Sequence, residues 1–323
     1  GGTIITAALI LQLAAGGIMV MLMDEVISKW GIGSGVSLFI AAGVSKTIIV
    51  RSLNFVGDGS SGAIPSAIMS LMGGRPEGAL ISMIPLVFTI LVFLIVGYAQ
   101  SMRVEIPLTM GRIRGFGYRH PLKFIYASNI PVILTSALLA NMEIFSRMLS
   151  NNGFTLFGTF NEGGQVTGGL MYFLSPPRDN TISNLVISYL SGVSIPPAAL
   201  TWITYTIFMV IGAIIFSVFW ITTTGMDEKS VAEQLHRSGL SIPGFRRDQR
   251  IMEKILKRYI LALSVMGGAF VGLLASFADF SGAFGSGTGI LLTVMIIYNL
   301  YEEISKQHME DMNPAVRKFL GNE

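Results

Sequence analysis

Few side chains in this sequence could carry out acid–base or metal chemistry near neutral pH. The three histidines, His120, His236 and His308, fall in three separate polar segments, and there is no cysteine. A metal or catalytic site would need long-range folding to bring these histidines together. The sequence also lacks the HExxH, GxSxG and GxxxxGKS/T patterns of metalloproteases, hydrolases and nucleotide-binding loops. We therefore expect solvated loop histidines, and neither an enzyme nor a bound metal.

Two groups of glycines could mark either a ligand site or a packing contact. Gly31, Gly33 and Gly35 form a GxGxG string, but no strand precedes it as a dinucleotide site would require. We interpret this string as a flexible helix start with close packing. Gly268 and Gly272 form a GxxxG pattern inside an apolar run, which lets another helix approach closely. Tight packing within one bundle explains this pattern better than a dimer contact.

Charged side chains are scarce inside the apolar runs. Ion-coupled transporters place titratable or ion-coordinating groups at membrane depth, because relaying a proton or holding an ion requires them there. Glu143 and Arg147, four residues apart near the end of one run, have the spacing of a helix-end ion pair. A small-solute secondary transporter and an intramembrane enzyme remain alternatives, and both lack the side chains that they would need.

The composition indicates that a lipid bilayer surrounds much of the chain. Of the 323 residues, 51% are hydrophobic and 13% are charged, and the mean hydropathy is +0.64. About 20 apolar residues cross a hydrocarbon core roughly 30 Å thick. The sequence therefore predicts an all-α polytopic membrane helix bundle with about seven transmembrane helices. The predicted spans are 3–23, 34–50, 80–99, 125–148, 200–221, 259–278 and 288–301.

The distribution of Lys and Arg predicts how the bundle is oriented. One alternating set of connecting segments carries 16 of these residues, and the opposite set carries 3. Lys and Arg accumulate in the cytosolic loops of membrane proteins. We therefore predict that loops 100–124 and 222–257 and the C-terminus are cytosolic and that loop 149–199 is external. Residues 1–323 are predicted to form a single multi-pass domain in the cell membrane.

Five segments of the sequence resemble one known family. They are Asp24 to Gly35, Met102 to Pro107, Ser128 to Ile133, Gly244 to Arg247 and Gly287 to Thr293. These segments are similar to those of the SecY-type subunit of the protein-conducting channel, in the family's order and with the expected spans between them. The second and third segments resemble archaeal rather than bacterial members. The resemblance covers the whole chain.

The resemblance implies an architecture, a function and a set of partners. The predicted spans match the fourth to the tenth of the family's ten, so we expect a chain that lacks the first three. The implied function is passage of unfolded polypeptides across the membrane, with lateral insertion of apolar segments into it. The implied partners are small membrane subunits of the SecE/gamma and beta types, the ribosome, signal sequences with the nascent polypeptide, and the lipid bilayer. No cofactor and no specific nucleic-acid sequence is implied.

The resemblance places four apolar residues, Val36, Ile40, Ile133 and Leu292, at the waist of the family's pore. Val36 and Ile40 are four residues apart, so one helix can present both to the same point. Branched apolar side chains form no hydrogen bonds with water or ions, and a narrow apolar ring can close by dewetting. For any one of these residues, ordinary helix packing or lipid contact is the alternative.

The resemblance also implies a lateral gate formed in part by the spans 125–148 and 200–221. Asn129 and Pro131 are the candidate gate residues. A helix that is kinked by an internal proline and carries an amide could hold two packings of similar energy. The alternative is a static kink with a local amide hydrogen bond.

Two of the predicted cytosolic loops carry clustered cations that could attract the phosphates of a ribosome. Arg246 is the strongest candidate, because its Gly-Phe-Arg context matches the family most closely. The alternative is that these charges only set the orientation of the chain in the membrane. The candidate docking residues are Arg112, Arg114, Arg119 and Lys123 in the first loop and Arg246, Arg247 and Arg250 in the second.

Overall fold

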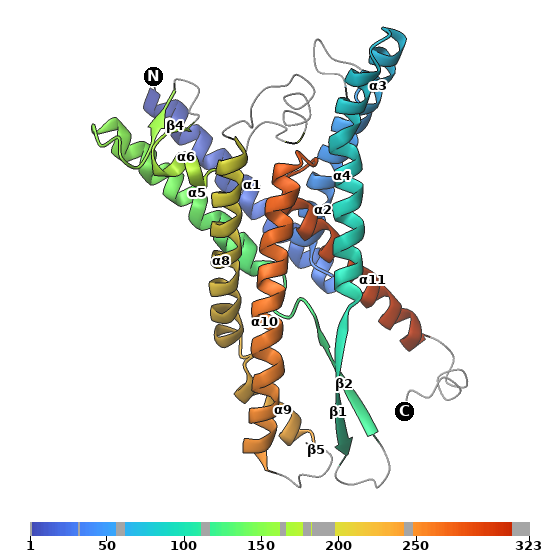
Figure 1. The fold of residues 1–323 in the computed structure, drawn as a ribbon. Coiled ribbons are helices and arrows are strands. Elements are labelled where there is room, and N and C mark those ends of the chain that lie inside the picture. The colour runs from blue at the N-terminus through green and yellow to red at the C-terminus, as the bar shows by residue number, and fades with distance from the viewer. Residues whose placement is uncertain are drawn as a thin grey trace.

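The computed structural model describes residues 2–31, 33–55, 62–110, 117–161, 166–176, 182, 198–241 and 248–311. Its long helices form a bundle, and a small sheet lies below them in the view of Figure 1. The prediction of a helical membrane bundle is confirmed, because among the described residues six helices are long and apolar enough to cross a membrane. The long helices are α1 (Gly2–Trp30), α2 (Gly35–Leu53), α4 (Pro76–Ser101), α5 (Ile130–Asn151), α8 (Ala198–Thr223), α10 (Gln249–Phe280) and α11 (Gly287–Asp311).

The long helices extend or shorten the predicted spans at their ends. Helix α1 continues past the apolar run to Trp30, and α10 begins well before its apolar part, at Gln249. Helix α5 begins at Ile130, later than its predicted span 125–148. Helix α11 contains the predicted span 288–301 but is not one of the six membrane-crossing candidates. Polar residues from Tyr298 onward, including Glu302, lower the hydropathy of its second half.

Close packing of α8 against α10 forms the centre of the bundle. A Cβ atom on Gly268 would lie 3.0 Å from the Ala213 carbonyl oxygen, and one on Gly272 would lie 2.9 Å from the Met209 carbonyl oxygen. Ala213 and Met209 are fully buried. The GxxxG pattern therefore packs within one chain, as predicted.

A carboxylate at the end of α10 ties three helices together. The Tyr205 hydroxyl on α8 donates to Asp279 Oδ2 at 2.8 Å, and the Gly287 amide at the start of α11 donates to Asp279 Oδ1 at 2.7 Å. Asp279 lies one residue beyond the predicted span 259–278, so the low charge inside the spans gave no indication of it.

The loop 100–124 folds as a β-hairpin. Strand β1 (Arg103–Met110) pairs antiparallel with β2 (Gly117–Lys123) and with the short β5 (Leu240–Ser241), in the order β2-β1-β5. In β1, Ile106 and Leu108 are buried whereas Glu105 and Pro107 are exposed. This period of two is the signature of a strand with one covered face.

The hairpin and the loop 222–257 form one small unit. That loop contains helix α9 (Glu228–Arg237), β5 and the first turns of α10. Ile106, Leu108 and Leu122 of the hairpin share a buried apolar cluster with Leu235 of α9 and Leu256 of α10. The two predicted cytosolic loops therefore build a single structure with its own core.

Short elements occupy the opposite end of the bundle. Helix α3 (Ala63–Met72) packs against α4 and lies at the top of Figure 1. The predicted external loop 149–199 contains β3 (Thr159–Phe160), β4 (Val166–Gly168) and α6 (Leu170–Leu174). The predicted ion pair is also present there, with Arg147 Nη2 3.4 Å from Glu143 Oε1.

The glycine string forms the junction between α1 and α2. The Asp24 carboxylate accepts hydrogen bonds from the Ser34 hydroxyl and the Val36 amide, both at 3.0 Å. Gly33 has a φ of +78°, and a Cβ atom on Gly35 would lie 2.9 Å from Ile27 Cδ1. Backbone conformation and close approach therefore explain these glycines without a ligand.

Candidate functional site

The start of α5 is bound to the middle of α11. The buried Asn129 donates from Nδ2 to the Leu291 carbonyl oxygen at 2.8 Å, and the Ser128 hydroxyl lies 3.0 Å from Met295 Sδ. Asn129 also begins α5, because its carbonyl oxygen accepts from the amide of Ile133. Of the predicted ring residues, Leu292 is therefore adjacent in sequence to this interhelical hydrogen bond, and Ile133 lies one helical turn after it.

The ring candidates are exposed relative to their neighbours. Val36 and Ile40 on α2 are 39% and 40% exposed, and Ile133 and Leu292 are partly exposed. By contrast, Val132 and Leu291, the residues adjacent to the last two, are 1% exposed. The neighbours thus form the packed core while the ring candidates face away from it. Helix α11 contacts both α2 and α5, so it connects the two other helices that carry these candidates.

Pro131 does not kink α5. It occupies one of the first two positions of that helix, where the missing N–H costs no helical hydrogen bond. The predicted kink at Pro131 is therefore wrong, because α5 begins at Ile130, five residues after the start of the predicted span 125–148. Pro85, by contrast, lies inside α4. Near it, the Thr89 hydroxyl donates to the Pro85 carbonyl oxygen at 2.6 Å and accepts from the Phe284 amide at 2.9 Å.

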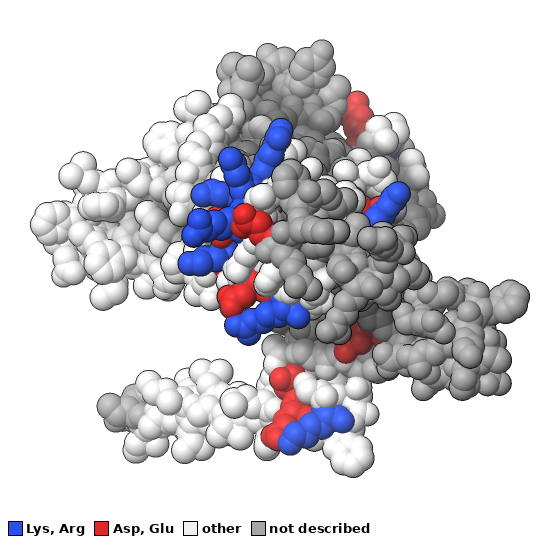
Figure 2. Space-filling model, turned by 90° about the horizontal axis from the view of Figure 1, so that it is seen from below, with Lys and Arg blue, Asp and Glu red and all other residues white. Residues whose placement is uncertain are grey.

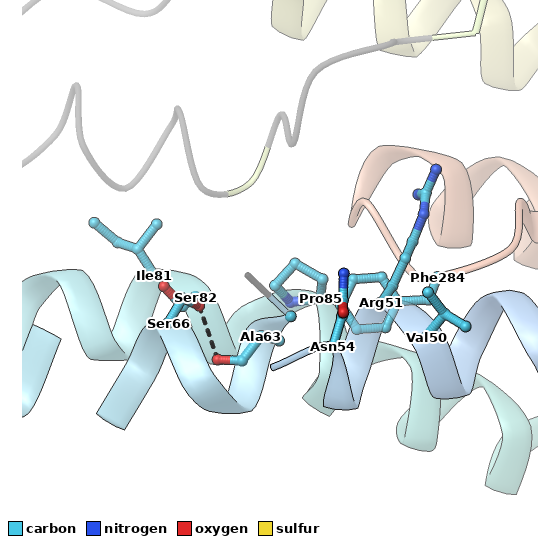
Figure 3. Close-up of a pocket in the computed structure, with 10 residues that line it drawn as sticks. Val50, Arg51, Asn54, Ala63, Ser66, Ile81, Ser82, Pro85 and Phe284 are labelled. Carbon is cyan, nitrogen blue, oxygen red and sulfur yellow. Dashed lines mark hydrogen bonds between the residues drawn. The ribbon is translucent and has the colours of Figure 1, made fainter. Parts of the chain in front are cut away.

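A hollow of 490 Å³ lies between α2, α3 and α4. Figure 3 shows Val50 and Arg51 of α2 at one end of it, with Ser66 of α3 and Ile81 of α4 at the other. Val50 lies nearly four turns, of about 3.6 residues each, after Val36 in α2. The two residues therefore lie on nearly the same face of that helix. The hollow therefore opens on the side of α2 that carries the ring candidates.

The candidate docking residues divide into described and undescribed positions. Arg112, Arg114, Arg246 and Arg247 lie outside the described residues. Arg119 and Arg250 are exposed, and Arg119 Nη1 is 3.0 Å from Glu105 Oε2 on the neighbouring strand. Figure 2, seen from the hairpin end, shows Lys and Arg side chains gathered on this face with acidic side chains among them. Further exposed cations lie on the first turns of α10, at Lys254, Lys257 and Arg258.

Lys123 has a different environment from the other docking candidates. Its Nζ atom is 2.8 Å from Glu302 Oε2 on α11, and Arg103 Nη2 is 2.6 Å from Glu302 Oε1. Arg103 Nη2 also donates to the Tyr298 hydroxyl at 3.4 Å, and this bond is the main cause that raises the pKa of Arg103 above its ordinary value. Lys123 therefore attaches the hairpin to α11.

Sequence reasoning missed Glu302 and Tyr298. Tyr298 lies in the last turn of the predicted span 288–301 and Glu302 directly follows that span, and no family motif quoted above includes them. Their spacing of four residues, which puts them on one helix face, is the only signal that could have indicated a joint role. Their partners lie about 180 to 200 positions away in the sequence, so no local pattern relates the two groups.

The described part of the chain holds no cluster of three His, Asp or Glu side chains with the geometry of a metal site. Of the three histidines, only His236, on α9, has a described side chain. His236 is partly buried, and α9 contains no second histidine.

Comparison with protein families and curated proteins points to one group. A family model described as SecY matches residues 2–301. The protein translocase subunit SecY of Methanococcus vannielii is 44% identical over 97% of this chain and 67% of its own length. The subunit of the same name from Pyrococcus furiosus is 45% identical over 98% of this chain and 69% of its own. The chain thus spans about two thirds of the length of these relatives. Both relatives are archaeal, in agreement with the resemblance predicted from the sequence.

Comparison with solved structures gives the same group. A structure described as that of a protein conducting channel aligns with a TM-score of 0.76 and 43% identity, covering 95% of this chain and 66% of its own. Sec61 in the canine ribosome-channel complex from the endoplasmic reticulum aligns with a TM-score of 0.72 and 41% identity, over 95% and 66% of the two chains. The similarity therefore extends over nearly the whole described bundle.

Proposed function

Because the chain belongs to the SecY family, we propose that it forms part of a membrane pore through which unfolded polypeptides pass. Its relatives are named protein translocase subunits, and its structural neighbours include a protein conducting channel. In this proposal the four ring candidates seal the pore, and the gate helices release apolar segments into lipid. Nothing in these comparisons favours the small-solute transporter that the sequence left open.

The observation that carries the proposal is the link between α5 and α11. The Asn129 hydrogen bond to the Leu291 carbonyl oxygen joins the start of α5, one turn before Ile133, to the residue adjacent to Leu292. Both side chains are partly exposed beside buried neighbours, as a lining residue would be. Because they are apolar and branched, they would hold neither water nor ions at a narrow point.

The hollow between α2, α3 and α4 supports the same function. It lies about 20 Å along α2 from Val36, at a helical rise of 1.5 Å per residue. Its lining combines Arg51 and Ser66 with apolar residues. A wider, partly polar space beyond a dry constriction suits a path that must pass any polypeptide. We place this hollow on the external side of the ring.

Asn129 supports a gate at the start of α5. Its Oδ1 atom is buried and accepts no hydrogen bond from a described residue. A buried amide oxygen without a donor costs about 1–3 kcal/mol, so a polar group from a facing segment would bind it favourably. The role of Pro131 in the gate would then be to set the first turn of α5 rather than to kink it.

The sheet and α9 form the docking surface in this proposal. Loops 100–124 and 222–257 share one sheet, since Thr109 pairs with Ser241 and Met110 with Leu240. The backbone leading to Arg112 and the backbone leading to Arg246 therefore start side by side. A ribosome is the partner that we propose for this surface, with small membrane subunits beside the bundle. Sec61, a structural neighbour, is described in a ribosome-channel complex.

Cross-linking from a stalled polypeptide tests the proposal. Single cysteines can be placed at Ile133 or Leu292, because residues 1–323 contain no cysteine. In the complete channel, a polypeptide arrested in transit and carrying a thiol-reactive probe should react with both positions. Matched controls are Leu138 on α5 and Ile297 on α11, which are 42% and 45% exposed. Each lies five residues from its ring position, about 140° around the helix.

Reaction at the ring positions and none at the controls is the expected pattern. Equal labelling of all four positions would mean that the polypeptide does not pass at this point, and would refute the proposed path.

A further inference from the structure

Glu302 on α11 holds both strands of the hairpin at once. Its Oε1 atom is 2.6 Å from Arg103 Nη2, and its Oε2 atom is 2.8 Å from Lys123 Nζ. Arg103 and Lys123 are register partners at the open end of the hairpin. One carboxylate therefore bridges the two strands where they meet the membrane bundle.

Tyr298 extends this contact by one helical turn. Arg103 donates to its hydroxyl, and Lys123 Nζ lies 5.7 Å from the centre of its ring. The Glu302 side chain is 21% exposed, compared with 58% for Glu25 in its pair with Lys29. Partial burial weakens the screening that makes exposed ion pairs nearly neutral in free energy. The contact is thus better suited to fix two elements than the pairs on the surface.

The same helix carries a ring candidate. Leu292 lies ten residues before Glu302, about 15 Å along the axis at 1.5 Å per residue. Helix α5 follows the hairpin in the chain and is bound to α11 through Asn129. Helix α11 therefore contacts two consecutive elements of the chain: the hairpin through Glu302 and α5 through Asn129.

We propose that Glu302 is a positioning residue that fixes the docking hairpin to α11, so that a ribosome bound at the hairpin moves the helix that carries Leu292. This inference rests on the proposed function. Replacing Glu302 by Gln would leave two cations facing each other without an anion, and the hairpin base would separate from α11. The docking surface itself, at the far end of the hairpin, would stay intact.

The test uses Glu302→Gln in the full-length chain assembled in its complex and reconstituted in vesicles. Ribosome affinity and the ratio of ion conductance with and without bound ribosomes are measured. We expect an affinity within about threefold of the wild type and a conductance ratio that falls close to one. Glu303→Gln is the matched control, because Glu303 is exposed and adjacent and makes no ion pair with a described residue of the hairpin. It should behave as the wild type.

A distance measurement separates this inference from the proposed function. Spin labels on cysteines at Pro121 and Ile304, both exposed, report the spacing of β2 and α11. Glu302→Gln should shift and broaden the distance distribution, and Glu303→Gln should not. Lys123→Gln, which removes one of the two cations, is a second variant with a smaller expected shift.

Two results would overturn the inference. One is an unchanged distance distribution or an unchanged conductance ratio in Glu302→Gln. The other is a loss of ribosome affinity well beyond threefold in Glu302→Gln, which would make Glu302 part of the docking surface. If the wild-type channel binds no ribosome, the proposed function fails, while the distances still decide whether Glu302 holds the hairpin on α11.

Discussion

Asn129 shows how one polar side chain can organise a largely apolar molecule. It begins α5 with its backbone and reaches α11 with its amide, and it is 2% exposed. Because the side chain is buried, water cannot readily replace a hydrogen bond that is lost there. The contact therefore fixes two helices in register at the point where two ring candidates lie.

Replacing Asn129 by alanine should destabilise the protein more than the same change elsewhere on α5. The variant loses a buried hydrogen bond and leaves the Leu291 carbonyl oxygen with one donor fewer, which we expect to cost about 1–3 kcal/mol. Asn141→Ala is the matched control, because Asn141 is exposed and donates within its own helix to Ala137. Thermal unfolding in detergent measures both. Equal losses of stability would contradict the anchoring role of Asn129.

For single residues, the sequence predicted which side chains make important contacts better than it predicted where those residues lie within a helix. Asn129 was selected correctly as a polar contact, but the helix-interior position was assigned to Pro131, which lies in the first turn of α5. The reason is local: whether a proline breaks a helix depends on where the helix begins. Ile125, Tyr126 and Ala127 are compatible with a membrane span, although α5 starts only at Ile130. The anchors Glu302 and Asp279 could not be found, because their partners lie far away in the sequence.

Elements were predictable where lipid imposes a simple rule. A long apolar run must be helical in a bilayer, so each predicted span coincides with a helix. Outside the membrane the rule fails, and the hairpin was missed although Val104, Ile106 and Leu108 alternate with exposed residues. Its pairing with β5 depends on a contact between distant segments, which no periodicity reveals.

Packing of α8 on α10 gives a prediction for an element. A methyl group at Gly272 would lie 2.9 Å from the Met209 carbonyl oxygen, so Gly272→Ala must separate the helices. We expect a loss of about 1–3 kcal/mol in the free energy of unfolding. Gly97 in α4 has nothing within 4 Å of its Cβ position, and Gly97→Ala should be neutral or stabilising by up to about 1 kcal/mol. Unfolding in denaturant distinguishes the two, and a harmless Gly272→Ala would argue against this packing.

Among the described residues, exposed Lys and Arg side chains are concentrated at the hairpin end of the molecule and are fewer at the opposite end. The hairpin, α9 and the first turns of α10 carry Arg119, Arg250 and further exposed cations. Arg75 directly precedes α4, whose first turns lie at the opposite end. This arrangement agrees with the charge split in the sequence. The positive end should face the cytosol.

Single cysteines and a membrane-impermeant reagent test this orientation in intact cells. A cysteine at Arg75 should be labelled from outside, and one at Arg250 should be labelled only after the membrane is permeabilised. Both residues are exposed, so access is limited by the membrane alone. Labelling of position 250 from outside would reverse the assignment of both docking loops.

The resting ion conductance of the complete channel in planar bilayers tests most directly whether the four ring candidates seal a pore. Ile133→Asn and Leu292→Asn place an amide that holds water at the constriction, so each should raise the resting conductance several-fold while expression and folding are retained. Leu138→Asn and Ile297→Asn, about 140° around the same helices, should leave it unchanged. A conductance that is the same in all four variants as in the wild type would contradict the proposal that these residues form the seal.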